Sequence, residues 1–522
     1  MKKHAFSFLV VLLQLLVFNF SQAQVHTYIP DSTFDGDGRK NFNFFNNIDR
    51  LYGVVVQQDG KPVMAGLSRN PSSGFFELCV TRLLINGDLD TTFNGTGTNC
   101  ISMGVQGSIG GMTPKIKIAP DGKFVLVNSG FPASSAAEDI MVCRLDTNGV
   151  LDPTFNGAGV LFVDMTNTNN RPDRANDLDI GSDGSIWAAG VTRTGGTPLE
   201  NEFAVVKVAP NGQLDLSFNG TGKKLFNPTG FAEFGRGIRI QSDGKIVLGG
   251  DAGGDMHVLR FDSTGVLDNT FNGTGSLNVV FQSFSDMAEL GIDSLGRIVV
   301  AGNLTTSTGD VVTARILPNG TFDTNYGTNG KYTFGTTGTS NIITQVHVQP
   351  DMKILIGGYS TTVAGGQDFL VARVDTSGVI DLTFNVQGYV TQSVLNGAVN
   401  EECNGLALMG DGRILLTGTL VLNSAINEDV GVVRLLPVIT SGTGFEESAS
   451  DFPVRVGPNP FRDELSILSQ IESDAVLLDA TGKVVMKIAI RPGVHRFDAS
   501  SLSSGMYLLH LPGRGSQKII KK

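Results

Sequence analysis

The chain has 522 residues, of which 66 are glycine and 17% are charged, with a formal net charge of −11. This length exceeds one ordinary compact core unless a repeat architecture spreads the core along the sequence. The acidic balance argues against nucleic acid as a partner, because phosphate binding needs clustered Lys and Arg side chains. Abundant glycine with many β-formers, and no long amphipathic helical stretch, predicts an all-β protein with many tight turns.

The N-terminus has the pattern of a secretory signal peptide. Lys2 and Lys3 precede an apolar run from Ala5 to about Phe20, and Ser21-Gln22-Ala23 forms a small-x-small cleavage site. A membrane anchor, the alternative, would need about 20 apolar residues and no cleavage site. We therefore predict a signal peptide over residues 1–23 and a mature protein without a membrane span.

Seven segments of the sequence repeat a tight turn followed by a β-rich strand. Asp-Gly between apolar strands is a strong hairpin signal, because glycine tolerates the positive φ that such turns need. The repeats are spaced by 52 to 62 residues. The turn positions are Gly60, Gly122, Gly184, Gly244, Gly296, Met352 and Gly412.

Each repeat next carries a strand with an acid five residues before a base, and then a signature D-x-[TSN]-[FY]. The acid/base pairs are Glu77/Arg82, Asp139/Arg144, Glu202/Lys207, Asp255/Arg260, Asp310/Arg315, Asp368/Arg373 and Asp429/Arg434. The signatures begin at Asp90, Asp152, Asp215, Asp268, Asp323 and Asp381, eight residues after the base. This spacing predicts that base and signature Asp face each other on neighbouring strands, a structural role worth roughly 0.2–1 kcal/mol.

The seventh signature is absent after Arg434 and stands instead at the N-terminus, as Asp31-Ser32-Thr33-Phe34. A ring closes in this way when the N-terminal segment completes the last blade and leaves no free sheet edge. We predict a seven-bladed β-propeller over residues 24–437, with Arg434 facing Asp31. An open solenoid, the alternative, would need polar capping repeats. The number of strands in each blade stays open.

These repeats resemble the delta-60 repeat family of bacterial surface and secreted proteins. The resemblance covers about residues 31–437 and rests on the turn, the acid/base strand and the signature. It implies a propeller-like fold and does not specify a ligand.

The C-terminal part changes character. Residues 438–453 are small, polar and acidic, as in a linker, and residues 454–522 show alternating strands that predict a small β-sandwich. This last part resembles the C-terminal sorting domain of type IX secretion substrates, although Gly457 stands where that family often has Tyr. The resemblance rests on GPNPF (Gly457–Phe461), LLDATGKVV (Leu477–Val485), LSSGMYLLHL (Leu502–Leu511) and KIIKK (Lys518–Lys522).

The resemblance implies that the type IX secretion machinery carries the protein across the outer membrane, for release or for anchoring at the cell surface. The motif residues that it implies are Pro458, Asn459, Pro460, Phe461, Gly505, Tyr507, Lys521 and Lys522.

No catalytic constellation or cofactor site is recognisable, since the sequence has no phosphate loop, GxSxG elbow or HExxH motif. Asp35 and Asp37 are weak candidates for calcium, because the sister copies of this turn read NGTG and indicate a turn former instead. Cys79 and Cys100 lie in one repeat, and the sequence leaves open whether they form a disulfide or are buried free thiols.

The leading hypothesis is a non-catalytic, monomeric binding or adhesion module for a glycan or a protein. The alternative is an extracellular hydrolase or lyase acting on polysaccharide from the propeller channel. That activity would need two or three carboxylates confined to one or two blades.

Connections of variable length join the second to the third strand of each repeat, and loops on a rigid scaffold are where binding residues concentrate. Loops that vary because nothing constrains them are the alternative interpretation. We expect the ligand face to carry Phe75, Phe76, Phe131, Leu199 and Tyr359.

Overall fold

The computed structural model describes residues 26–45, 47–104, 112–133, 135–168, 170–195, 200–281, 283–305, 309–336, 340–361, 365–395, 399–422, 428–439, 454–457, 461, 463–469, 472–479, 483–511 and 515–521. The expected signal peptide, residues 1–23, lies outside these ranges. The chain splits into two compact units, Thr27–Val438 and a second one that contains the residues from Ile439 onward. Every element of the described residues is a strand, and no helix that could span a membrane is found among them.

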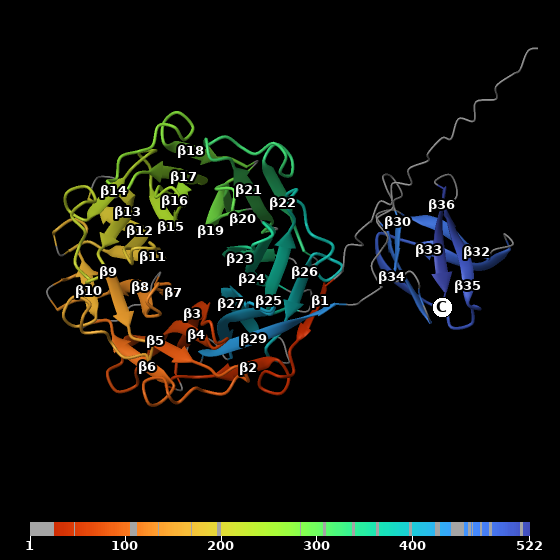
Figure 1. Ribbon diagram of the computed structural model, residues 1–522, viewed down its shortest axis with the longest axis horizontal. Coiled ribbons are helices and arrows are strands. Elements are labelled where there is room, and N and C mark those ends of the chain that lie inside the picture. Colours follow the sequence, from red (N-terminus) through yellow and green to blue (C-terminus); the bar gives the residue numbers. More distant parts are fainter. Residues whose placement is uncertain are drawn as a thin grey trace, which may run out of the picture. The chain divides into compact units, whose positions relative to one another are not determined.

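The described part of the first unit forms a ring of seven four-stranded antiparallel units, here called blades 1 to 7 (Figure 1). Blades 1 to 5 are separate sheets whose strands follow one another from the centre of the ring outward. Their strands are β3 Asp49–Val56, β4 Pro62–Arg69, β5 Phe76–Arg82 and β6 Thr98–Ser102; β7 Lys115–Ile118, β8 Phe124–Gly130, β9 Asp139–Leu145 and β10 Val160–Val163; β11 Asp173–Ile180, β12 Ile186–Thr194, β13 Glu200–Val208 and β14 Lys223–Phe226; β15 Glu233–Ile240, β16 Ile246–Ala252, β17 Asp255–Phe261 and β18 Ser276–Val279; β19 Ser285–Ile292, β20 Ile298–Leu304, β21 Val311–Ile316 and β22 Lys331–Phe334.

Blades 6 and 7 share one sheet through a single bridge between Gln367 and Asn400. Blade 6 consists of β23 Ser340–Val348, β24 Ile354–Thr361, β25 Gln367–Val374 and β26 Tyr389–Gln392. Blade 7 consists of β27 Asn400–Leu408, β28 Ile414–Val421, β29 Glu428–Ile439 and β2 Arg39–Phe42, with β1 His26–Pro30 also beside β29. β29 extends to Ile439, two residues into the segment expected to be a linker.

The burial of the strands follows from the ring. β8 and β9 are buried along their whole length, because each blade packs face to face against both neighbours. In the inner strands, buried and partly exposed residues alternate instead, as in β3. Side chains on one side of the strand pack against the blades, and side chains on the other side face the channel.

The N-terminal segment closes the ring as the sequence predicts. Arg434 Nε lies 2.8 Å from Asp31 Oδ2, and the Asp31 amide donates to the Arg434 carbonyl at 2.9 Å. The outer strand of blade 7 is β2, which pairs with β29 from Arg39, opposite Val433, to Phe42, opposite Val430. The two ends of the propeller are therefore joined by a β-ladder and a buried ion pair.

The predicted pairing of base and signature Asp occurs in every blade. The cationic nitrogen lies 2.7–2.9 Å from a carboxylate oxygen in all seven copies. In the six blades with Arg, the guanidinium also lies 4.6–4.9 Å from the centroid of the signature aromatic ring. The signature is therefore a packing motif that buries a ring under a paired cation.

The same motif joins each blade to the next. Phe93 of blade 1 packs against Gly149 in the outer turn of blade 2, where φ is 82° and a Cβ would lie 2.4 Å from the ring. The Asn94 amide donates to the Asn148 carbonyl of that turn at 2.6 Å. Glycine is needed at position 149 both for the positive φ and for the approach of the ring.

Cys79 and Cys100 lie directly opposite each other on β5 and β6 and form a disulfide. The sequence leaves this pairing open, and the strand register decides it. Cys143 and Cys403 are buried free thiols.

The second unit is a two-layer β-sandwich, described by itself. One sheet holds β30 Val454–Gly457, β31 Glu464–Ser469 and β34 Gly493–Asp498; the other holds β33 Val484–Ile490, β32 Ser473–Asp479, β35 Gly505–Leu511 and β36 Gly515–Lys521. Phe461 is fully buried in its core, and its ring centroid lies 6.4 Å from that of Tyr507. The Lys521 ammonium is also buried and donates to the Ser500 carbonyl at 3.2 Å. Pro458, Asn459, Pro460 and Lys522 lie outside the described residues.

Ring closure is tested by replacing Arg434 with Met. The side chain of Asp31 is 1% exposed, so it would keep a buried charge with Arg413 as its only close cation. Removing one partner of a buried ion pair costs about 3–5 kcal/mol, and we expect a loss of about 3 kcal/mol in urea unfolding of the propeller. The double variant Asp31→Asn/Arg434→Met should recover most of that loss. As a control, Asp37→Asn, at a side chain that is 63% exposed, should change stability by less than about 0.5 kcal/mol. An Arg434→Met variant as stable as the wild type would contradict this closure.

Candidate functional site at the channel mouth

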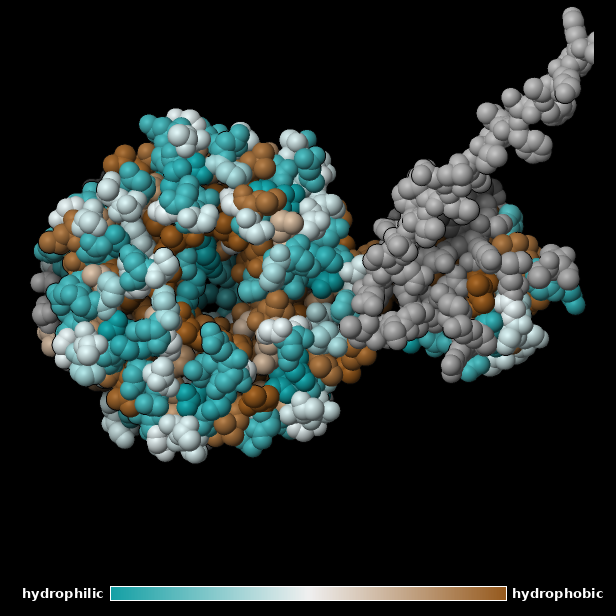
Figure 2. Space-filling view, viewed as in Figure 1, coloured by the Kyte–Doolittle hydropathy of each residue, from teal (hydrophilic) through white to brown (hydrophobic). Residues whose placement is uncertain are grey.

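A cavity of about 420 Å³ opens at one end of the central channel. Residues of all seven inner strands line it, together with Thr305 and Gly309 from the connection between β20 and β21. Figure 2 shows the hollow at the centre of the ring, with hydrophilic residues in its wall. The cavity therefore lies on the face that carries the variable connections.

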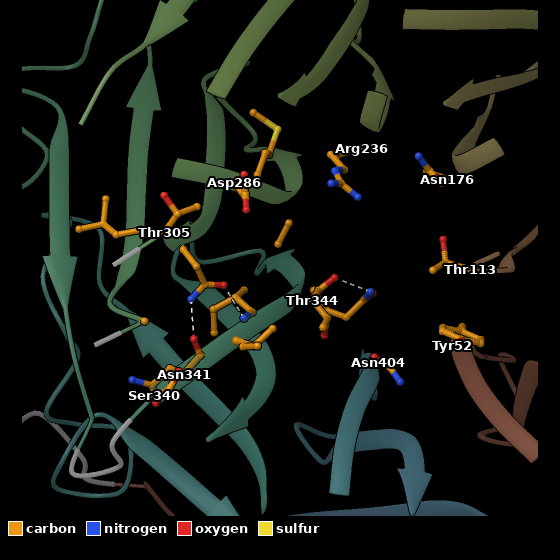
Figure 3. A pocket seen from close by; sticks show the side chains of 18 of the residues that line it. Tyr52, Thr113, Asn176, Arg236, Asp286, Thr305, Ser340, Asn341, Thr344 and Asn404 are labelled. Carbon is orange, nitrogen blue, oxygen red and sulfur yellow. Dashed lines mark hydrogen bonds between the residues drawn. The ribbon is translucent and has the colours of Figure 1, made fainter. Parts of the chain in front are cut away.

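In six of the seven inner strands, a β-bulge places one residue in the wall of this cavity. In each of these strands, the pairing register with the second strand of the blade shifts by one residue, which marks a β-bulge. The side chain of the extra residue leaves the regular alternation of side chains along the strand. The bulged residues are Tyr52, Asn176, Arg236, Ala288, Thr344 and Asn404, and all of them line the cavity. Figure 3 shows five of them, Tyr52, Asn176, Arg236, Thr344 and Asn404, on different strands around one open space.

Two bulged side chains are held by the neighbouring blade, and Arg236 is held within its own blade. Asn176 donates to the Gly235 carbonyl at 2.7 Å, and Thr344 donates to the Cys403 carbonyl at 2.8 Å. Arg236 is 40% exposed and forms an ion pair with Asp251 at 2.8 Å. The cavity wall is thus a preorganised set of amide, hydroxyl and guanidinium groups.

A second cavity of about 370 Å³ continues along the channel and shares Lys115 and Gln345 with the first. Within it, Arg239 forms ion pairs with both Asp177 and Glu289. Burial opposes the charge of Glu289, but Lys115 and Arg239 offset it, so the pKa of Glu289 is lowered. The channel therefore contains charges from several blades that neutralise one another.

Asp179 belongs to the same charged region. Its carboxylate accepts from Lys117 Nζ at 2.6 Å and from the Ile240 amide at 2.8 Å. Burial raises its pKa, but the charges of Lys117 and Arg239 outweigh burial, so the pKa of Asp179 is lowered. This carboxylate is held in its charged form.

Exposed phenylalanines lie beside the channel mouth. Phe231 is 66% exposed and Phe284 is 65% exposed, one on each side of the two-glycine turn at Gly253 and Gly254. The Phe284 carbonyl accepts from the Thr305 amide at 2.9 Å, so the backbone of Phe284 is joined to a residue of the cavity wall. Phe234 is 36% exposed, and its ring lies 5.8 Å from the guanidinium of Arg236 in the same wall. We call Phe231, Phe234 and Phe284 the aromatic patch.

Of the residues expected from the sequence to form the ligand face, Phe75 and Tyr359 belong to different blades. Phe75 is 41% exposed, whereas Phe76 and Phe131 are each only 7% exposed and belong to the core, which corrects the expectation for both. Phe76 and Phe131 are buried because they lie at the beginning or end of a strand, where their rings pack between blades. Tyr359 is half-buried on β24, and Leu199 lies outside the described residues.

Sequence reasoning missed the aromatic patch and the bulged residues. The patch lies on the connections between blades and at the start of β15, in the segments NPTGFAEF and FQSF, which contain four phenylalanines among turn residues. That local excess of aromatic residues was the available signal. The bulges gave no signal in the sequence, because one extra residue in an inner strand changes only the strand register.

The two weak calcium candidates are already engaged. Asp35 has a φ of 51°, as Asn94 has in a sister turn, and its carboxylate pairs with Lys40 at 2.7 Å. Asp37 accepts from the Arg39 amide at 2.9 Å. Among the described residues, no group of three or more His, Cys, Asp or Glu side chains is placed to hold a metal ion.

Comparisons with known proteins agree with both units. A family model described as a domain of unknown function (DUF5122) β-propeller matches residues 241–271, 296–326 and 349–384. A secretion system C-terminal sorting domain matches residues 455–522. No curated protein matches the sequence significantly.

Several solved structures are similar to the chain at low identity. A virginiamycin B lyase from Staphylococcus aureus has 11% identity and a TM-score of 0.44, covering 76% of this chain and 99% of that one. The β-propeller domain of the Trilobed protease from Pyrococcus furiosus has 10% identity and a TM-score of 0.38, covering 75% and 94%. A PL25 ulvan lyase has 11% identity and a TM-score of 0.43, covering 74% and 95%. At these values the activities of those proteins do not carry over.

The fold and the two matches define an exported β-propeller protein. The chain combines propeller repeats with a C-terminal sorting domain of type IX secretion, and it is a secreted or cell-surface protein.

Buried carboxyls at the start of the inner strands should make stability depend on pH. Asp173 accepts from the Met165 amide at 2.7 Å, and burial, assisted by the charges of Asp164 and Asp139, raises its pKa from 3.8 to about 7. Because the folded pKa lies above the unfolded value, this group stabilises the fold most below about pH 4. That contribution is lost as the pH rises through about 7.

We therefore expect Asp173→Asn to be more stable than the wild type at pH 8, and to lose less stability between pH 5 and pH 8. The amide oxygen of Asn can still accept from Met165. Urea midpoints at the two pH values measure the effect, with the exposed Asp88→Asn as the control. Parallel pH profiles for Asp173→Asn and the wild type would contradict the assignment.

The sorting domain predicts the route of export. Deleting residues 454–522 should leave a folded propeller in the periplasm, because its core does not depend on the second unit. Cell fractionation followed by immunoblotting measures this. Normal amounts of the truncated protein outside the cell would show that export does not need the domain.

Proposed function

We propose that this exported propeller is a binding module that takes a glycan at the channel mouth. The observation that carries the proposal is the difference between two repeat positions. The buried base and the signature Asp recur in all seven blades, whereas the bulged position carries Tyr, Asn, Arg, Ala and Thr around one cavity. Structural roles repeat in every blade, while a single ligand would need unequal groups at the centre.

The chemistry of the channel mouth suits a sugar chain. Asn176, Thr344 and Asn404 offer amide and hydroxyl groups to sugar hydroxyls. Tyr52 in the cavity wall and the neighbouring aromatic patch offer ring faces to the apolar faces of sugar rings. A cavity of about 420 Å³ that opens toward exposed rings favours a chain that enters with one end.

Two carboxylates of the channel, Asp179 and Glu289, do not suit the acid that hydrolysis requires. Glycoside hydrolysis needs one carboxyl with a raised pKa to act as the acid. Asp177 and Glu289 share Arg239, Asp179 is paired with Lys117, and the pKa values of Glu289 and Asp179 are lowered. Glu289 and Asp179 therefore do not supply the protonated carboxyl that the polysaccharide-cleaving alternative requires.

The proposal is tested on a glycan array with the mature protein, followed by calorimetry with the best ligand. Phe284→Ala removes an exposed ring of the patch and Asn404→Ala removes a polar group of the cavity. We expect each to weaken binding by about tenfold, as for truncation of a central contact residue.

Leu295→Ala is the matched control, because Leu295 is 61% exposed and lies in the β19–β20 turn on the other face of the ring. It should bind as the wild type does. The absence of any bound glycan, or equal loss in the control, would reject the proposal. Release of shortened oligosaccharides would support the hydrolase or lyase instead.

A further inference from the structure

Six blades share a second cation beside the signature Asp. The residue directly after the turn position is Lys or Arg, and its nitrogen lies 2.8–3.4 Å from the signature carboxylate. These cations are Lys61, Lys123, Lys245, Arg297, Lys353 and Arg413. Each signature carboxylate in these blades thus accepts from two positive groups.

Blade 3 lacks this second cation. Ser185 stands at the position after its turn, and Lys207 at 2.7 Å is the cation paired with Asp215. The side chain of Asp215 is 26% exposed, against 1–10% for the other six signature carboxylates. The Asp215 carboxylate is therefore both less neutralised and more accessible than its counterparts.

A second donor is missing at the same junction. In five blades the guanidinium also donates to a carbonyl in the outer turn of the next blade, as Arg82 does to Thr147 at 2.9 Å. Ser263 holds the equivalent position in blade 4. Lys207 bonds to Ser217 and Asp215 instead, and in the described part of the chain it makes no such bond to Ser263.

A cavity of about 610 Å³ lies where these groups are missing, between blades 3 and 4. Ser185, Lys207 and Ser263 line it, together with Asp183 and Trp187. Trp187 stands where the other blades have Val or Leu, and it is the only tryptophan of the chain. The cavity opens among the Asp-Gly turns, on the face opposite the channel mouth.

We propose that this cavity binds an alkylammonium or alkylguanidinium group. Such a group would take the place that a Lys or Arg side chain of the protein itself occupies in the other blades. Its charge would complement Asp215, a donor would reach the Ser263 carbonyl, and its alkyl part would fill the cavity that Trp187 lines. This site is independent of the glycan site.

Trp187 gives a direct readout of binding, since all tryptophan emission of the protein comes from the cavity wall. The mature protein is titrated with n-butylammonium, n-butylguanidinium and capped lysine (N-acetyl-lysine methylamide) at constant ionic strength. We expect saturable emission changes with these cations and none with n-butanol. Tighter binding of capped lysine than of 1,4-diaminobutane would assign the site to a protein side chain, and the reverse order to a free polyamine.

Three variants separate this site from a general effect of salt. Ser185→Lys supplies the missing cation from within and should weaken n-butylammonium binding by about tenfold or more. Asp215→Asn removes the charge without filling the cavity and should weaken binding similarly, which covers the case in which Ser185→Lys does not fold. Asp88→Asn removes an exposed carboxylate of blade 1, outside this cavity, and should bind as the wild type does.

The proposal is overturned if none of the cations changes the emission, or if n-butanol produces the same change. It is also overturned if folded Ser185→Lys and Asp215→Asn both respond as the wild type does.

Discussion

The structure of the ring depends on one buried ion pair that is repeated in each blade. The base of the third strand holds the signature carboxylate, and in six blades its guanidinium also covers an aromatic ring that packs against the next blade. Leaving either charge alone in this setting would cost several kcal/mol. The pair therefore couples the fold within a blade to the contact between blades, and its seventh copy, Arg434 with Asp31, couples the two ends of the propeller.

This constraint divides the two faces of the propeller by role. The turns that carry the ion pairs must keep their length and their residues, so one face repeats around the ring. The other face contains the connections that the ion pairs leave free, together with the bulges that point into the channel. The unequal side chains at the channel mouth and the aromatic patch both lie at positions where the repeat does not fix the residue type.

Blade 3 shows what happens when the repeat itself changes. Replacement of the second cation by Ser185, and of the bridging Arg by Lys207, leaves a carboxylate paired with one cation, Lys207, and a cavity lined by Trp187. The remaining blades define what is missing there, which is a long cationic side chain. In a repeat protein, comparison of one blade with the others thus shows which residues are missing and where a ligand could replace them.

The sequence by itself determined the all-β class, the repeats, the pairing of each base with an Asp eight residues later, and closure by the N-terminal segment. These follow from local spacing, because a turn of fixed length brings fixed positions together. Only the tertiary structure decided which side chains share the channel mouth, that Phe76 and Phe131 are buried, and that Cys79 faces Cys100. Those outcomes depend on strand register, bulges and packing between blades, which bring together residues up to about 350 positions apart, such as Tyr52 and Asn404.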